Sequence, residues 1–212
     1  MIKVENIEVS GWKAAIKSMR NPLQSWDKSD SFRSVDCTDE CREIFTLGKN
    51  DLELMQKLVK AGSDHAKFMR FINVTMDITA PTYFFLQFDT FKVGTVSNST
   101  SKMHTIHKTP ITEDLFSFDK TELSDVSKAY LEELEILRQK FVDTGDKKFW
   151  YSLIQRLPES FNQLRTVQFN YQVAQHMYHS RKNHKLDEWR ELCNIMLNEL
   201  PYFAVIIGIQ ND

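Results

Sequence analysis

A run of hydroxyl side chains at residues 95–102 offers the clearest opportunity for ligand chemistry in this sequence. The run directly follows Gly94 and holds five hydroxyl groups, the amide of Asn98 and the cation Lys102. Hydroxyl and backbone N–H groups donate to phosphate oxygens, and Lys92 and Lys102 would add the opposite charge. The run therefore predicts a phosphate-binding loop, although an ordinary solvated Ser/Thr loop has the same composition.

A second set of polar side chains recurs at spacings near three and four in the C-terminal part of the chain. Its members are Asn170, Gln172, His176, His179 and Arg181. Residues at such spacings gather on one face of a helix. The stripe therefore predicts a helix face that either binds a ligand or simply meets solvent.

Neither the cysteines nor the remaining histidines form a specific metal or nucleophile motif. Cys37 and Cys41 are four residues apart, and His104 and His107 are three apart. A zinc site needs four ligands, or three and a water, and no compact third and fourth ligand accompanies either pair. Cys193 lies among apolar residues at helical spacing, which favours a small core residue over a nucleophile. We therefore predict no metal site and no catalytic triad.

Length and charge restrict the class of protein. The chain has 212 residues, 42% apolar and 26% charged, so we expect one globular domain over residues 1–212. Lys and Arg number 27 against 29 acidic residues, which disfavours binding to DNA or RNA. No apolar run approaches the roughly 20 residues that cross a membrane. Three cysteines and no signal-peptide pattern favour the cytoplasm.

Hydrophobic periodicity predicts both strands and helices. Alternating apolar residues predict strands over residues 1–9 and 71–80, and an apolar run predicts a last strand over 203–209. Apolar residues three and four apart predict one helix from Asn50 or Asp51 to a stop at Gly62, and others over 82–92, 124–142, 159–181 and 187–200. Gly94 would end the helix over 82–92, and residues 21–39 are expected to form a surface loop. The pattern is typical of an α+β fold in which long helices pack a small mixed or antiparallel sheet.

The hydroxyl run resembles the signature of the flavin-dependent thymidylate synthase family, R-H-R-x-x-S-x-N-x-x-S-x-R. In that family an Ala-Pro pair precedes the signature, and a Gln lies three residues ahead of it. Here Ala80-Pro81 precede Gln87, and Thr90-Phe91-Lys92 stand against R-H-R, so the first Arg and the His are replaced. The later signature positions are taken by Thr95, Ser97, Thr100 and Lys102.

The C-terminal half is similar to the family as well. Leu157-Pro158 match a characteristic Leu-Pro, and Asn170 and Arg181 fall eleven residues apart, as they do in the family. Gln172 stands where the family has Arg, and His176 where it usually has Asn. Ile154 also stands where the family has an Arg.

This resemblance covers about residues 62–201 and implies a homotetramer whose active sites lie between subunits. It implies reductive methylation of dUMP to dTMP with an FAD cofactor, and with NADPH and methylenetetrahydrofolate as co-substrates. The implied substrate contacts are Gln87, Thr100, Lys102 and Arg181, of which Arg181 is also the implied catalytic residue. The implied cofactor contacts are Lys92, Thr95, Ser97, Asn98, Asn170, Gln172 and His176. Such a site requires the charged groups of Lys92, Lys102 and Arg181 to converge around one cavity.

Two alternatives stay open at this point. Thr90 and Phe91 remove a cation and a ring that would meet the cofactor, so the chain could be a divergent member that keeps the fold and nucleotide binding without flavin chemistry. It could also be an unrelated interaction protein whose hydroxyl run is solvated surface.

Overall fold

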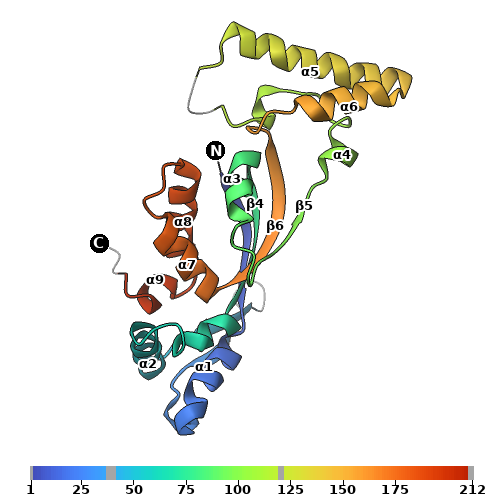
Figure 1. Cartoon of the computed structure of the whole chain (residues 1–212). Coiled ribbons are helices and arrows are strands. Elements are labelled where there is room, and N and C mark those ends of the chain that lie inside the picture. The colour runs from blue at the N-terminus through green and yellow to red at the C-terminus, as the bar shows by residue number, and fades with distance from the viewer. Residues whose placement is uncertain (1, 37–41, 119–121, 210–212) are drawn as a thin grey trace.

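An antiparallel sheet of four strands forms the centre of the molecule (Figure 1). The computed structural model describes residues 2–36, 42–118 and 122–209. The strands lie across the sheet in the order β1 (Lys3–Ser10), β4 (Asn73–Pro81), β6 (Asn162–Asn170) and β5 (Val96–Ser99). All three neighbouring pairs are antiparallel, which confirms the α+β class and the small antiparallel sheet. The strands predicted over residues 1–9 and 71–80 are confirmed as β1 and β4.

One face of the sheet is covered by helices (Figure 1). In β4 the alternate residues Val74, Met76, Ile78 and Ala80 are fully buried, and the residues between them are only half-buried. The buried face packs against α3 (Thr82–Phe88), α7 (Tyr171–Arg181) and α8 (Asp187–Glu199). The helix predicted over 187–200 is thereby confirmed, and its Cys193 is buried in the core as expected.

The prediction of one helix over residues 159–181 is wrong in its first half. The segment forms β6 and then α7, which begins directly after Asn170. The side chain of Asn170 caps α7 by accepting a hydrogen bond of 3.1 Å from the backbone N–H of Val173. Pairing of β6 with β4 along its whole length outweighs the helical spacing of its side chains.

The prediction of a strand over residues 203–209 is also wrong. Phe203, Ala204 and Ile206 form the short helix α9 (Phe203–Ile206), and all three side chains are buried against the core. A short apolar run does not distinguish a buried strand from a buried helix turn by periodicity alone.

The helix predicted over 82–92 ends four residues early, at Phe88. The hydroxyl of Thr90 donates to the carbonyl of Gln87 at 2.7 Å, and Phe91 turns back into the core with 9% of its surface exposed. Gly94 does not end the helix; it lies in the following turn with φ +80°.

A second layer at one end of the sheet contains α1 (Trp12–Arg20), α2 (Lys49–Lys60) and the hairpin of β2 (Phe32–Asp36) and β3 (Arg42–Thr46). The loop expected over residues 21–39 is therefore wrong where β2 forms, and its remainder includes short turns of 3₁₀ helix at Asn21–Leu23 and Trp26–Lys28. Another 3₁₀ segment, Ala66–Phe71, leads into β4. The Cys37 and Cys41 pair lies outside the described residues.

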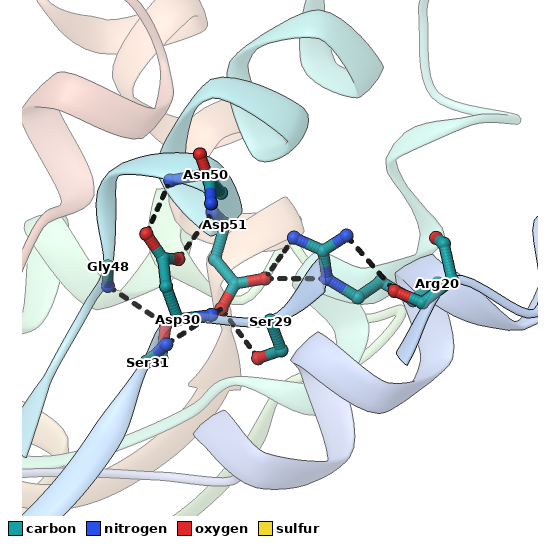
Figure 2. Close-up of polar contacts among 8 residues, drawn as sticks. Arg20, Ser29, Asp30, Ser31, Gly48, Asn50 and Asp51 are labelled. Atoms are coloured by element: carbon teal, nitrogen blue, oxygen red, sulfur yellow. Dashed lines mark hydrogen bonds and ion pairs between the residues drawn. The ribbon is translucent and has the colours of Figure 1, made fainter. Parts of the chain in front are cut away.

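A buried ion pair joins α1 to α2 (Figure 2). The carboxylate of Asp51 lies 2.7 Å from Nη2 of Arg20 and accepts hydrogen bonds from the hydroxyls of Ser29 and Ser31. The sequence predicts Asn50 or Asp51 as the N-terminal cap of α2, and this prediction is wrong. Gly48 occupies the cap position. The predicted stop of this helix is confirmed, because Gly62 follows it with φ +105°.

A helical hairpin extends from the end of the sheet that lies opposite α1 and α2 (Figure 1). It consists of α5 (Asp125–Thr144) and α6 (Lys147–Arg156), and the chain reaches it through α4 (Lys102–Thr105) and a 3₁₀ turn at Glu113–Leu115. The hairpin has its own small apolar core, which includes Leu131, Leu134 and Leu153. The helix predicted over 124–142 is confirmed, and the Ser124 side chain caps it. No helix within the described ranges combines the length and the hydropathy needed to span a membrane.

Candidate functional site

Two of the predicted substrate residues, Gln87 and Arg181, share a single aromatic neighbour. The indole N–H of Trp189 donates to Oε1 of Gln87 at 3.1 Å. The guanidinium carbon of Arg181 lies 5.1 Å from the ring centroid of Trp189 and 5.4 Å from that of Phe91. α3, α7 and α8 thus each contribute to one cluster, because all three pack on the same face of the sheet.

The guanidinium group of Arg181 lies over the rings of Phe91 and Trp189. Arg181 makes no ion pair with any described residue, and its buried Nε has no hydrogen-bond acceptor among them. An unpaired polar atom in a buried position costs free energy unless a ligand or water satisfies it. The arrangement therefore suits a ligand oxygen approaching Arg181.

A cavity of about 520 Å³ lies beside this cluster, between α7 and the turn after α3. Among its lining residues are three of the predicted cofactor contacts, Lys92, Gln172 and His176. The rings of His176 and Phe91 meet edge to face, with 5.4 Å between their centroids. Arg70 also lines the cavity, and its Nε donates a short hydrogen bond to Oε1 of Gln172. Cations, amides and one aromatic wall therefore meet in a space of the size that ligand pockets usually have.

Asn170 and Thr95 lie close to this cavity, where the turn at Gly94 packs tightly against the start of α7. A Cβ atom on Gly94 would lie 3.1 Å from Cγ2 of Val173 and 3.4 Å from Nδ2 of Asn170. The hydroxyl of Thr95 is buried and has no hydrogen-bond partner among the described residues. Within those ranges, four buried side-chain polar atoms lack a partner, and Thr95 and Arg181 supply two of them.

The run predicted as a loop is partly a strand, β5, and this separates two predicted cofactor contacts. Ser97 pairs with Val167, whose side chain faces the core, whereas Asn98 pairs with Thr166 on the opposite face. Successive side chains of a strand point to opposite faces of the sheet. Ser97 and Asn98 therefore cannot both face the same ligand within one chain.

Thr100 and Lys102 lie near the start of β6, at the opposite end of the strand from Asn170. The backbone N–H of Thr100 donates to the carbonyl of Leu164 at 2.9 Å, and Nε2 of Gln163 donates to the carbonyl of Thr100 at 2.8 Å. From Leu164 to Asn170 the strand rises by about 20 Å at roughly 3.4 Å per residue. Lys102 is thus remote from the cavity that contains Lys92, and a common cavity for Lys92, Lys102 and Arg181 stays a prediction that needs a second chain.

Two cations of these regions do not figure among the sequence predictions. Arg70 precedes β4 in a segment without clear periodicity, so no sequence signal marks it. Arg165 lies in β6, which the sequence predicts as a helix, and its ion pair with Asp89 connects residues far apart in the chain. Only the pairing of β6 with β5 and β4 places Arg165 beside the hydroxyl run.

Comparison with known proteins identifies the fold. No protein-family model and no curated protein sequence matches the chain. The solved structures that resemble it include two of the flavin-dependent thymidylate synthase ThyX from Helicobacter pylori, each containing FAD and dUMP. Their TM-scores are 0.71 and 0.70 at 17% and 18% sequence identity; 98% and 97% of this chain align with 97% of each of those chains. The chain therefore has the fold of flavin-dependent thymidylate synthases, which confirms that part of the resemblance seen in the sequence.

Proposed function

We propose that the protein is a flavin-dependent thymidylate synthase that binds FAD and dUMP and methylates dUMP reductively. One observation supports this proposal most strongly. The buried hydroxyl of Thr95 and the buried Nε of Arg181 have no hydrogen-bond partner among the described residues, and both residues are ligand contacts implied by the sequence resemblance. The fold shared with an enzyme whose structures contain FAD and dUMP supports the same ligands here.

The cavity beside α7 fits the chemistry of FAD. A flavin dinucleotide carries a diphosphate and a flat ring system, and the cavity offers the cations Arg70 and Lys92 and the rings of Phe91 and His176. Charge-assisted hydrogen bonds from such cations are the strong ones. Gln172 and His176 would contribute further polar contacts, while the buried hydroxyl of Thr95, which has no partner among the described residues, would donate from the adjoining turn.

The nucleotide would be bound by residues from two regions. Arg181 and Gln87 lie together at Trp189 and suit the oxygens of a pyrimidine ring. Thr100 and Lys102 suit a phosphate but lie toward the other end of β6. We propose that a second copy of the chain completes the site, in keeping with the homotetramer that the resemblance implies.

The residues of this chain would bind and polarise, and the redox chemistry would be that of the cofactor. A bound flavin, reduced by NADPH, supplies hydride transfer, which no side chain provides, and methylenetetrahydrofolate would supply the carbon. Arg181 would stabilise negative charge on the uracil oxygen, because its cation lies over two rings and pairs with no described carboxylate. Cys193 is not a candidate nucleophile, since burial raises the pKa of its thiol to about 11.

A specific observation favours a second candidate, a nucleotide-binding member without flavin chemistry. Phe91 is buried between Trp189 and His176, where the family signature has a His, and Thr90 replaces the preceding Arg. These changes remove a cation and a polar ring from the wall of the proposed flavin cavity.

Thermal unfolding with FAD, dUMP and both ligands together tests the two candidates. A ligand at a hundred times its dissociation constant stabilises the folded state by about 2.7 kcal/mol. A flavin spectrum in the purified protein, and dTMP formation with NADPH and methylenetetrahydrofolate, would support the enzyme. Arg181→Gln should then abolish dTMP formation, with Arg190→Gln as a control, because Arg190 pairs with Asp187 at an exposed position. Stabilisation by dUMP alone would favour the second candidate, and stabilisation by neither ligand would contradict both.

A further inference from the structure

Arg165 lies on the covered face of β6 with much of its hydrogen-bonding capacity unused. Its Nη1 lies 2.8 Å from Oδ1 of Asp89, and its Nε donates to Oε1 of Gln163 at 3.2 Å. The guanidinium carbon lies over the Phe85 ring of α3, 4.1 Å from its centroid. A guanidinium has five N–H donors, and no described residue accepts from the Nη2 of Arg165.

A second cation approaches the same place. Lys102 is half-buried, its Nζ lies 5.9 Å from the ring centroid of Phe161, and it forms no ion pair with any residue that the structure describes. Burial lowers the pKa of Lys102, and the positive charge of Arg165 lowers it further. The two cations therefore repel one another in a partly desolvated position, which an anion between them would relieve.

The hydroxyl run is tied directly to Arg165. Gln163 accepts from Nε of Arg165 and donates through Nε2 to the carbonyl of Thr100 at 2.8 Å. Gln163 is buried, so this link fixes the guanidinium relative to the segment that carries Thr100 and Lys102. Ser99 is the register partner of Arg165 and brings a further hydroxyl to the same face.

A purely structural role would explain only part of this arrangement. The ion pair with Asp89 is half open to solvent on the carboxylate side, where the Asp89 side chain is 47% exposed, so it contributes little to stability. It also leaves one carboxylate against two cations. A structural role gives no reason to place Lys102 near Arg165, since no carboxylate of the described residues pairs with Lys102.

We propose that Arg165, together with Lys102, binds the phosphate of the nucleotide substrate, with the planar edge of the guanidinium gripping two phosphate oxygens. A guanidinium suits such bidentate binding, whereas an ammonium acts as a point charge. Arg165 thereby makes the protein select nucleotides over nucleosides. This inference rests on the proposed function for the identity of the base, but not for the recognition of phosphate.

Calorimetric titration with dUMP and with deoxyuridine separates phosphate binding from folding. Arg165→Gln should weaken dUMP binding about 10- to 100-fold, the effect of a lost charged hydrogen-bonding partner, and leave deoxyuridine binding unchanged. The dUMP affinity of Arg165→Lys should lie between those of the wild type and Arg165→Gln, because lysine keeps the charge and loses the planar pair of N–H donors. Asp89→Asn should tighten dUMP binding, since it removes the competing carboxylate. Lys57→Gln, which removes an exposed cation of α2, is the control and should match the wild type.

The outcomes are distinct. Equal weakening of dUMP and deoxyuridine by Arg165→Gln, or no weakening of either, would overturn the inference. If the wild type binds other nucleoside monophosphates or inorganic phosphate through Arg165 but not dUMP, the proposed function fails and the phosphate site stands. A wild type without affinity for dUMP, other nucleoside monophosphates or inorganic phosphate would also overturn it.

Discussion

The buried ion pair between Arg20 and Asp51 allows a quantitative test of what holds the N-terminal layer together. Asp51 is 0% exposed, and one of its oxygens lies 2.7 Å from both Nε and Nη2 of Arg20. Asp51→Ala would leave that guanidinium buried without its counter-ion and would remove the acceptor of the Ser29 and Ser31 hydroxyls. Removing one partner of a buried pair costs about 3–5 kcal/mol, so we expect the free energy of unfolding to fall by that amount. Replacing Arg20 by Met and Asp51 by Leu together should recover part of the loss, because no charge is then buried alone.

Urea unfolding at neutral and acidic pH measures this contribution. Burial favours a higher pKa for Asp51, but hydrogen bonds from Ser31, Ser29 and Arg20 outweigh burial and hold the pKa below 3.8. The contribution is therefore complete above the unfolded-state pKa and is lost as the pH falls through the folded-state pKa, so wild type and Asp51→Ala should converge in acid. Glu5→Ala is the control, because its exposed pair with Lys3 contributes at most about 1 kcal/mol. A loss for Asp51→Ala no larger than that of the control would refute the reasoning.

Three further predictions concern single positions. Ser124→Ala should lower the free energy of unfolding by about 1 kcal/mol in urea, because it removes the cap of α5; an unchanged midpoint would contradict this. Gly94→Ala should lower the free energy of unfolding by about 1–2 kcal/mol, because alanine is strained at a φ of +80°. The added Cβ should also displace Val173 and weaken the proposed FAD binding, measured by fluorescence titration. Unchanged stability and affinity would contradict this prediction. Cys193, in a variant whose other two cysteines are Ser, should react with a thiol reagent only after unfolding, and rapid native labelling would contradict its burial.

The sequence predicts elements in which apolar side chains are buried and polar side chains are exposed. It misses β6, in which this relation fails at the start of the strand. β4 alternates strictly, with apolar side chains inward, so its period of two is visible. In β6 the polar Gln163 is buried and the apolar Leu164 is 38% exposed, which reverses the expected alternation at the start of the strand. Gln163 can be buried because Thr100, a residue distant in sequence, accepts its hydrogen bond. No local window contains that information.

The candidate site divides in the same way. Gln87, Arg181 and Lys92 could be predicted as site residues because the family resemblance marks them, and the structure places them around Trp189, Phe91 and the neighbouring cavity. The role proposed for Arg165 could not be predicted, because it depends on the pairing of β6 with β5. The separation of Ser97 from Asn98 likewise follows from the alternation of a strand that the sequence predicts as a loop.

If FAD and dUMP bind as proposed, Phe91 at the position of the signature His affects the two ligands differently. The Phe91 ring packs 5.6 Å from Trp189 and 5.4 Å from His176, centroid to centroid, so an apolar ring occupies the position where the family signature has a polar one. Toward the proposed flavin cavity this change removes a hydrogen-bonding group. Toward the nucleotide it supplies a second face for Arg181, whose charge stays unneutralised because no described carboxylate pairs with it. The proposed flavin affinity can therefore fall while the proposed nucleotide affinity is kept. Loss of nucleotide affinity alone would require Arg181 to lose its aromatic support.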